Sequence, residues 1–246
     1  MPPPNKKVAI VTGASRGIGS AVAERLAKDG FAVLVNYAGG EAEAAAVVEK
    51  IRDAGGSALA VRADVSKPTD VSRLFDEAEK EFGGVDVLVN NAGVMPLSSI
   101  ATTDDATFDR VVAVNLKGTF NGLREAARRL RDGGRVINFS SSVIGLRLEG
   151  YGAYVATKAA VEGLTVIASK ELGKRSITVN AVAPGPTGTD LFLRGKSPDL
   201  VDHLARLNPF GRLGTPPDVA AVVAFLAGPD GAWVNGQVIR ANGGML

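Results

Sequence analysis

VAIVTGASRGIG, residues 8–19, joins a short apolar segment to a glycine-rich turn and then to a run with helical spacing. A helix that begins directly after such a turn presents free backbone N–H groups and the positive end of its dipole. Glycine in the turn lets an anion approach the main chain closely. The stretch therefore predicts a phosphate-binding unit of strand, turn and helix near the start of the chain.

Short apolar segments alternate with longer segments of helical spacing along the whole chain. The strand-like segments are 8–12, 31–36, 58–64, 85–91, 134–140, 176–184 and 236–244, and the helix-like ones are 19–29, 41–54, 68–82, 108–130, 154–172 and 217–227. Parallel strands need crossover connections, and strands buried on both faces are continuously apolar. The pattern predicts an α/β fold, a single Rossmann-type doubly wound domain at 7–246 behind a flexible head at 1–6. Its seven-stranded sheet is expected to be mostly parallel, with helices on both faces.

Residues 184–214 interrupt this alternation with a proline-containing segment that has no clear strand. A segment of that length in a doubly wound domain is typical of a functional loop, and we expect it to be a substrate lid. Its apolar and basic side chains, at 191–196 and 203–213, would cover the cleft. The loop 143–152, with Leu146, Arg147 and Leu148, would form the opposite wall.

Composition narrows the functional classes. The chain has 246 residues, a net charge of +2, no cysteine and a single histidine, His203. Disulfides and thiolate catalysis are excluded, and we expect no metal site and a surface position for His203. The near-neutral net charge does not indicate binding to nucleic acid. No apolar stretch approaches the ~18 residues of a membrane span, so we expect a cytoplasmic protein with no membrane contact.

The spacing of the opening turn, G-x-x-x-G-x-G, differs from the usual dinucleotide fingerprint, and such a turn can also serve only tight helix packing. Further motifs follow it: DV at 64–65, NNAG at 90–93, Asn115, SSS at 140–142, YVATK at 154–158 and PGPTGTD at 184–190. In this order and spacing, the chain resembles the classical short-chain dehydrogenase/reductase family over essentially its whole length. It looks most like the 3-oxoacyl-[acyl-carrier-protein] reductase branch.

The resemblance implies NADP(H) as cofactor and assigns residues to each part of it. The glycine turn would hold the pyrophosphate, the end of the second strand the adenosine ribose, and residues 64–65 the adenine. Residues 91–93 would line the cleft, and the remaining positions would meet the nicotinamide and its ribose. The residues are Gly13, Ser15, Arg16, Gly17, Ile18, Gly19, Asn36, Tyr37, Ala38, Asp64, Val65, Asn91, Ala92, Gly93, Tyr154, Lys158, Pro184, Gly185, Thr187 and Thr189.

The end of the second predicted strand bears on the choice between NADP and NAD. An acidic residue there would accept from both ribose hydroxyls of NAD and repel a 2′-phosphate. The chain has Asn36 and Tyr37 at this place, and its next acid is Glu41. A guanidinium pairs well with phosphate, and the resemblance places Arg16 close to it. We therefore expect a preference for NADPH, with Asn36 beside the ribose.

Tyr154 and Lys158 are four residues apart in a helical segment and so share one face. A nearby ammonium favours the phenolate by about 4 kcal/mol at ~4 Å and an effective dielectric near ~20, so we expect Lys158 to lower the pKa of Tyr154. Two signals disagree on the serine that would hold the carbonyl oxygen. The family's usual spacing to the tyrosine selects Ser141, whereas the following VIG selects Ser142, which we prefer. Asn115 matches the asparagine that holds a water leading toward the lysine.

These residues predict reduction of a small-molecule ketone or aldehyde carbonyl to an alcohol. The alternatives are a non-catalytic dinucleotide sensor on the same fold and, less consistent with the glycine spacing, a sugar-nucleotide epimerase or dehydratase. Residues 153–172 are small or apolar around most of the helix, which predicts a subunit contact. Members of the family that the chain resembles are commonly oligomers, so we expect a homotetramer or homodimer. An acidic carrier protein is a further possible partner of the arginines at 124, 128, 129 and 131, although helix C-termini favour cations in any case.

Overall fold

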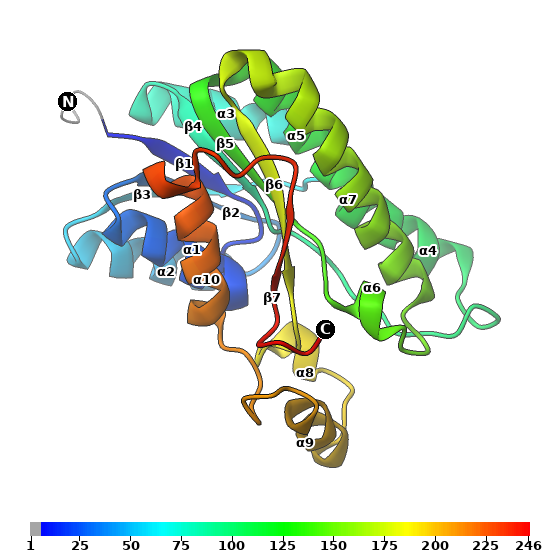
Figure 1. Ribbon diagram of the computed structural model, residues 1–246. Helices are drawn as coiled ribbons and strands as arrows, with labels where there is room; N and C mark the ends of the chain where they lie inside the picture. The colour runs from blue at the N-terminus through cyan, green and yellow to red at the C-terminus, as the bar shows by residue number, and fades with distance from the viewer. Residues whose placement is uncertain (1–5) are drawn as a thin grey trace.

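A seven-stranded parallel sheet forms the centre of the computed structural model, which describes residues 6–246 (Figure 1). The strands are β1 (Val8–Val11), β2 (Ala32–Tyr37), β3 (Ser57–Arg62), β4 (Val85–Asn90), β5 (Leu130–Phe139), β6 (Thr178–Pro184) and β7 (Val238–Ala241). Their order is β3-β2-β1-β4-β5-β6-β7, and all pairings are parallel. The expected fold class and all expected strands are confirmed. The flexible head falls outside the described residues except for Lys6, whose Nζ donates to Ser57 Oγ over 3.2 Å.

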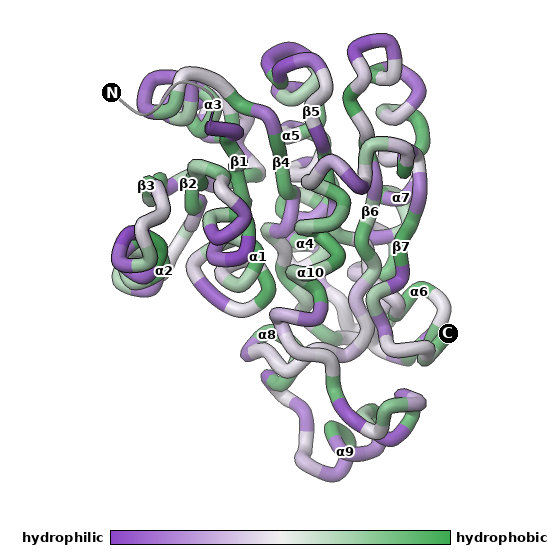
Figure 2. Tube along the Cα trace, turned by 60° about the vertical axis from the view of Figure 1, so that its left-hand side comes forward, coloured by the Kyte–Doolittle hydropathy of each residue, from purple (hydrophilic) through white to green (hydrophobic). Residues whose placement is uncertain are grey.

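Helices cover both faces of the sheet. On one face lie α1 (Gly17–Lys28), α2 (Glu41–Asp53) and α10 (Pro216–Ala227), and on the other α3 (Pro68–Phe82), α5 (Gly118–Arg129) and α7 (Gly152–Leu172) (Figure 1). Side chains alternate between the faces along each strand. Ala9 and Val11 therefore pack under the first layer, and Val8 and Ile10 under the second. The central strands are buried on both faces, and β1 is apolar along its whole length, as the tube in Figure 2 shows.

The strand order reverses at β1, which pairs with β2 on one side and β4 on the other. In open α/β sheets, ligands bind outside the carboxyl ends of the strands at such a switch point. The turns after β1, β4, β5 and β6 all leave this edge. The edge therefore brings together motifs that lie far apart in the sequence.

The predicted lid segment forms two short helices, α8 (Asp190–Leu193) and α9 (Pro198–Arg206), which extend beyond this edge of the sheet (Figure 1). Ser197 caps α9 by accepting from the Leu200 N–H, and Pro198 occupies the first turn. The two ends of the segment are joined, because the Gly188 N–H donates to Gly214 O over 2.9 Å. The segment therefore leaves the edge of the sheet and returns to the same place.

The region expected as one helix at 108–130 is divided. It consists of α4 (Asp105–Val111), a π-helical segment at Val112–Lys117, and α5. Extra-wide π turns are common at functional sites, and this one contains Asn115. The remaining short elements are α6 (Val143–Leu146) and the 3-10 turns at Gly173–Arg175 and Pro229–Gly231. Across residues 6–246, none of the helices has the length and apolar character needed to cross a membrane.

Candidate active site

The glycine turn after β1 is as tight as its sequence implies. Gly13 and Gly17 have φ values of +63° and +60°, a region that favours glycine. A Cβ on Gly13 would lie 2.8 Å from Ala92 Cα, and one on Gly19 would lie 2.3 Å from Gly13 O. The glycines therefore serve close packing and also leave the helix N-terminus open.

Two polar side chains hold this turn to the loop that follows β4. The Asn91 amide donates to Thr12 O over 2.8 Å and to Gly13 O over 3.0 Å. Thr12 Oγ1 in turn accepts from the backbone N–H groups of Asn91 and Ala92, each over 3.0 Å. The turn and the start of the loop after β4 thus form one preorganised wall.

Asn36 does not have the position expected from the sequence. Its side chain is 1% exposed, and Oδ1 accepts from the Gly13 N–H over 3.1 Å. Its amide donates to Ala63 O over 3.0 Å and, at 3.3 Å, to Val61 O and Tyr37 O. All its hydrogen-bonding groups are engaged, so it ties β1, β2 and β3 together and does not face a ribose. Tyr37 is also buried, and Ala38 is the first exposed residue after β2.

Arg16 and Ser15 lie in the glycine turn, where an anion would approach it. Arg16, directly before α1, is exposed and has no ion-pair partner within residues 6–246. Ser15 lies near Gly40, where an added Cβ would be 3.7 Å from Ser15 Oγ. A free guanidinium beside a helix N-terminus fits a nucleotide phosphate.

Asp64 and Val65 have the positions that the resemblance assigns to the adenine. Among the described residues, one carboxylate oxygen of Asp64 is hydrogen-bonded and the other is not. Asp64 Oδ1 accepts from the Ser66 hydroxyl over 2.7 Å and from the Ser66 N–H over 3.0 Å, and no donor within residues 6–246 reaches Oδ2. Val65 is buried, and its carbonyl accepts from Asn121 over 2.9 Å. The placement leaves a carboxylate oxygen for an adenine amino group, as the resemblance implies.

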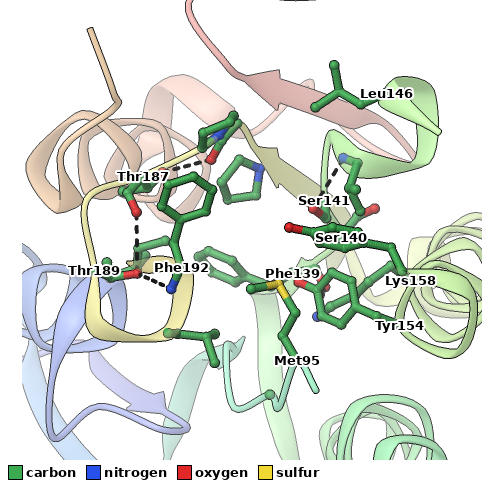
Figure 3. A pocket seen from close by; sticks show the side chains of 18 of the residues that line it. Met95, Phe139, Ser140, Ser141, Leu146, Tyr154, Lys158, Thr187, Thr189 and Phe192 are labelled. Atoms are coloured by element: carbon green, nitrogen blue, oxygen red, sulfur yellow. Dashed lines mark hydrogen bonds between the residues drawn. The ribbon is translucent and has the colours of Figure 1, made fainter. Parts of the chain in front are cut away.

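A cavity opens beside this turn, at the carboxyl ends of β4, β5 and β6. Figure 3 shows Tyr154, Lys158 and Ser141 on one side of it, with Thr187, Thr189 and Phe192 on the other. Its lining comprises Ile18, Asn91, Gly93, Met95, Phe139, Ser140, Ser141, Val143, Leu146, Leu148, Tyr151, Tyr154, Lys158, Pro184, Gly185, Pro186, Thr187, Thr189, Leu191, Phe192 and Leu204. The cavity thus joins predicted catalytic, nicotinamide-binding and lid residues in one space.

Tyr154 and Lys158 both point into this cavity from α7. Burial raises the pKa of Tyr154 to about 12, and a hydrogen bond with the Ser141 side chain opposes that rise. Burial also lowers the pKa of Lys158 to about 8. The Lys158 ammonium donates to Phe139 O over 2.7 Å and lies 5.6 Å from the centre of the Tyr154 ring. The expected lowering of the tyrosine pKa is contradicted, because burial disfavours the phenolate and raises it.

The three serines after β5 point in three directions. Ser140 Oγ donates to Glu162 over 2.6 Å, whereas Ser141 faces Tyr154. Ser142 is 3% exposed, and its hydroxyl donates to Ala183 O over 2.9 Å. The structure thus contradicts the preference for Ser142, which is turned away from the cavity.

Asn115 is fully buried behind the cavity. Its Oδ1 accepts from the Val94 N–H over 2.8 Å, and its amide donates to Val94 O over 2.9 Å and to Thr157 Oγ1 over 3.3 Å. A Cβ on Gly93 would lie 3.4 Å from Asn115 Oδ1 and 3.8 Å from Lys158 Nζ. Asn115 therefore fixes the segment after β4 beside the lysine, while the water-holding role stays a prediction.

The segment after β6 faces Tyr154 across the cavity. Thr187 Oγ1 donates to Gly185 O over 2.9 Å, and Thr189 caps α8 by accepting from the Phe192 N–H. A Cβ on Gly185 would lie 2.9 Å from Asn242 Cβ, so only glycine fits there. Pro184, Gly185, Thr187 and Thr189 all line the cavity, as the resemblance implies for nicotinamide contacts.

The arginine cluster at the end of α5 is engaged within the chain. Arg129 pairs with Glu79 at 2.6 Å and Asp76 at 2.7 Å, and these carboxylates raise its pKa. Arg131 pairs with Asp86 at 3.1 Å, and Arg128 with Glu125 at 3.5 Å. These contacts agree with the alternative that the cations serve the fold. His203 lies exposed on α9, as expected.

Several lining residues were not predicted from the sequence. Met95, Phe139 and Tyr151 belong to the wall, but none lies in one of the motifs quoted from the sequence. Tyr151 stands three residues before Tyr154, so helical spacing was an available signal for it. Within residues 6–246, no group of three or more histidine, aspartate or glutamate side chains is gathered as a metal site.

Comparison with known proteins agrees with this geometry. A family model described as enoyl-(acyl carrier protein) reductase matches residues 13–246. A "short-chain type dehydrogenase/reductase" of Picea abies is 46% identical over 250 residues, which cover 98% of this chain and 92% of that protein. The "3-oxoacyl-[acyl-carrier-protein] reductase FabG" of Staphylococcus epidermidis is 43% identical, with 97% of this chain and 98% of that protein covered.

Solved structures give the same result. The crystal structure of the angucycline C-6 ketoreductase LanV with bound NADP superimposes with a TM-score of 0.92 at 41% identity, covering 98% of this chain and 95% of that one. The glycine turn, the switch-point cavity and the Tyr154–Lys158 pair lie in one continuous site in the present chain. On this sequence and structural similarity, the chain belongs to the short-chain dehydrogenase/reductase family and is related to its 3-oxoacyl-[acyl-carrier-protein] reductases.

Proposed function

We propose that the protein uses NADPH to reduce a ketone or aldehyde carbonyl to an alcohol. The observation that carries this proposal is the convergence of Tyr154, Ser141 and Lys158 on one cavity beside the glycine turn. NADP(H) is the cofactor, and when bound it supplies the hydride. Among relatives, "NADPH-dependent aldehyde reductase 2, chloroplastic" of Arabidopsis thaliana is 46% identical over 255 residues.

Tyr154 is the general acid of this reaction. With a pKa of about 12 it keeps its proton at neutral pH and can donate it to an oxygen on which negative charge develops. The hydroxyl of Ser141 holds the same oxygen. In the direction of alcohol oxidation, the same phenolic oxygen would act as the base after loss of its proton.

Lys158 supplies positive charge beneath the tyrosine. At pH 7 a pKa of about 8 leaves most of the lysine protonated, and the ammonium is fixed by Phe139 O. Its remaining N–H groups are available to the ribose hydroxyls of the cofactor. Asn115 keeps the Gly93–Val94 segment in place beside it.

Arg16 binds the 2′-phosphate of NADPH in this proposal. The guanidinium is unpaired in the described chain, and no acid stands at the end of β2 to repel the phosphate. We expect kcat/KM with NADPH to exceed that with NADH at least tenfold, about 1.4 kcal/mol. Arg16→Ala should remove most of this preference.

The test is a substrate screen with purified protein. NADPH oxidation is followed by absorbance with a panel of ketones, diketones and aldehydes, and NADH is used in parallel. Turnover that depends on the carbonyl compound supports the proposal. The contrary result is tight NADPH binding without turnover of any member of the panel, which is the behaviour of a dinucleotide sensor.

We also propose self-association, as a homotetramer or a homodimer. Phe120 on α5 and Val166 and Ile167 on α7 are 46%, 39% and 56% exposed, which supports a covered face on these two helices. Trp233, before β7, is 98% exposed. Sedimentation of the parent and of Ile167→Asp, which places a charge on the α7 face, tests this; a monomeric parent would contradict it.

A further inference from the structure

The substrate end of the cavity is built almost entirely from apolar side chains. Met95, Val143, Leu146, Leu148, Leu191 and Leu204 line it together with the rings of Tyr151 and Phe192. Lys158 is the one charged residue of the lining, and its ammonium is held by Phe139 O. A substrate carboxylate or phosphate would lose its hydration here, and no charged side chain of the lining other than Lys158 could pair with it.

Lys196 connects the two aromatic side chains of this wall from outside. Its ammonium donates to Phe192 O over 2.6 Å and lies 4.6 Å from the centre of the Phe192 ring. The same ammonium lies 5.9 Å from the centre of the Tyr151 ring. Phe192 and Lys196 belong to the lid segment, whereas Tyr151 directly precedes α7. A single cation therefore joins the lid to the opposite wall through two rings.

Tyr151 continues this contact to the reacting centre. Its ring meets that of Tyr154 edge to face, with centroids 6.4 Å apart and planes at 67°. A carbonyl group placed at the Tyr154 hydroxyl thus has its adjoining carbon skeleton beside the Tyr151 ring. The Phe192 ring approaches from the other side of the cavity (Figure 3).

We propose that Tyr151, Phe192 and Lys196 form an aromatic latch that selects an uncharged carbonyl compound with a flat apolar body, an aryl ketone or aldehyde. Lys196 is a positioning residue, because it orients the two rings and does not line the cavity. This inference rests on the proposed reductase function and names the substrate class of that site.

The experiment compares acetophenone, 4-acetylbenzoate and 2-butanone as substrates with NADPH. Acetophenone presents a flat uncharged ring, 4-acetylbenzoate adds a carboxylate to the same ketone, and 2-butanone lacks the ring. The parent should show kcat/KM at least tenfold higher for acetophenone than for either of the others. Equal or reversed preference overturns the inference and leaves the reductase function standing.

Variants then test the latch itself. Lys196→Met keeps the length of the side chain but removes the charge, so KM for acetophenone should rise about tenfold while kcat and the KM for 2-butanone change less than twofold. Lys196→Arg should restore the acetophenone KM to within about threefold. Lys174→Met changes an exposed lysine in the 3-10 turn that follows α7; it is the matched control and should equal the parent. An equal rise of KM for both ketones in Lys196→Met would contradict a role for the latch in selection.

A binding measurement separates this inference from the function. Saturation-transfer NMR of acetophenone is recorded on the parent, Lys196→Met and Tyr151→Leu proteins loaded with NADP+. If no carbonyl is turned over, the reductase proposal fails, yet binding of acetophenone that both variants weaken still supports the aromatic site. Absence of acetophenone binding to the folded parent overturns the inference. Tyr151→Leu removes one ring directly, so the test stands even if Lys196→Met does not fold.

Discussion

The glycine turn and the lid border the same cavity, but they are held in place by different forces. Thr12, Asn36 and Asn91 fix the turn through hydrogen bonds to backbone groups that follow β1, β3 and β4. The lid carries exposed Leu191, Leu193 and Phe210, at 46%, 41% and 72%, and buries only a few side chains such as Leu204.

This difference between the turn and the lid matches the different demands of a nucleotide cofactor and a carbonyl substrate. A nucleotide presents the same phosphates and ribose in every reaction, so a rigid, preorganised backbone site suits it. A carbonyl substrate varies in its skeleton, and a wall of apolar side chains on a separate segment can change without disturbing the turn. Changes at the turn should therefore alter cofactor binding or stability, and changes at the lid should alter substrate constants.

The largest effect is expected where the two regions meet, at Tyr154. Tyr154→Phe keeps the ring and its packing on Tyr151 but removes the proton donor. kcat should fall at least about a hundredfold, the scale of a lost general acid, while the Kd for NADPH stays within about threefold. Steady-state kinetics and fluorescence titration with NADPH measure the two quantities. Turnover within a few-fold of the parent would remove Tyr154 from the mechanism.

The next effect concerns the rigidity of the turn. Asn36→Asp would bury a negative charge and lose the amide that donates to three carbonyls, so we expect the free energy of unfolding to fall by about 2 kcal/mol. Urea unfolding of the parent and variant measures it.

Ala38→Asp is the matched control for this substitution. Ala38 is exposed just beyond β2, so an acid there should cost less than about 0.5 kcal/mol of stability. It should instead weaken NADPH binding relative to NADH. If Asn36→Asp were fully stable and itself shifted the preference to NADH, Asn36 would face the ribose as the sequence suggested.

A smaller loss is expected from the serine that faces the cavity. Ser141→Ala should lower kcat about twentyfold, because a hydrogen bond to the carbonyl oxygen is lost. Ser142→Ala removes only a hydroxyl bound to Ala183 O and should change kcat less than threefold. Parallel kinetics of the two variants decide between them, and the opposite ranking would support the sequence-based preference for Ser142.

The smallest effect is a pH dependence of about tenfold. Lys158 loses its proton as the pH rises through about 8, so kcat/KM for NADPH should fall about tenfold between pH 7 and 9, since this ratio reports the free enzyme. Tyr154, with a pKa of about 12, does not titrate in this range. A decline centred above pH 10 would mean that burial does not lower the pKa of Lys158, and no decline at all would mean that its charged form is not required.

The same pKa makes a separate statement about stability. The pKa of Lys158 in the folded chain is lower than in the unfolded chain, so between about pH 8 and 10 the unfolded state binds more protons. By linkage this contribution increases stability with rising pH, opposite in direction to the loss of activity. Urea unfolding across this pH range, with Lys158→Met as a reference that lacks the titrating group, measures it.

The sequence alone determined the alternation of strands and helices, the anion-binding turn and the Tyr154–Lys158 pair. These features are local. A strand that is covered by helices on both faces is mostly apolar, and a turn with φ near +60° favours glycine. A four-residue spacing places two side chains on one face of a helix. Helix α3 shows how complete such signals can be, since the proline at its start and the glycine after its end mark both bounds found in the structure.

The tertiary structure alone decided where side chains point once strands from distant parts of the chain are side by side. Asn36 turned inward because the carbonyls of β3 and the Gly13 N–H are its neighbours, and neither is near it in sequence. Ser141 rather than Ser142 faces Tyr154 because the turn into α6 sets the direction of each hydroxyl. The pKa of Tyr154 rises instead of falling because the assembled walls exclude water from both members of the pair. Hydration and hydrogen-bond partners belong to the assembled site, and the spacing of residues along one segment does not fix them.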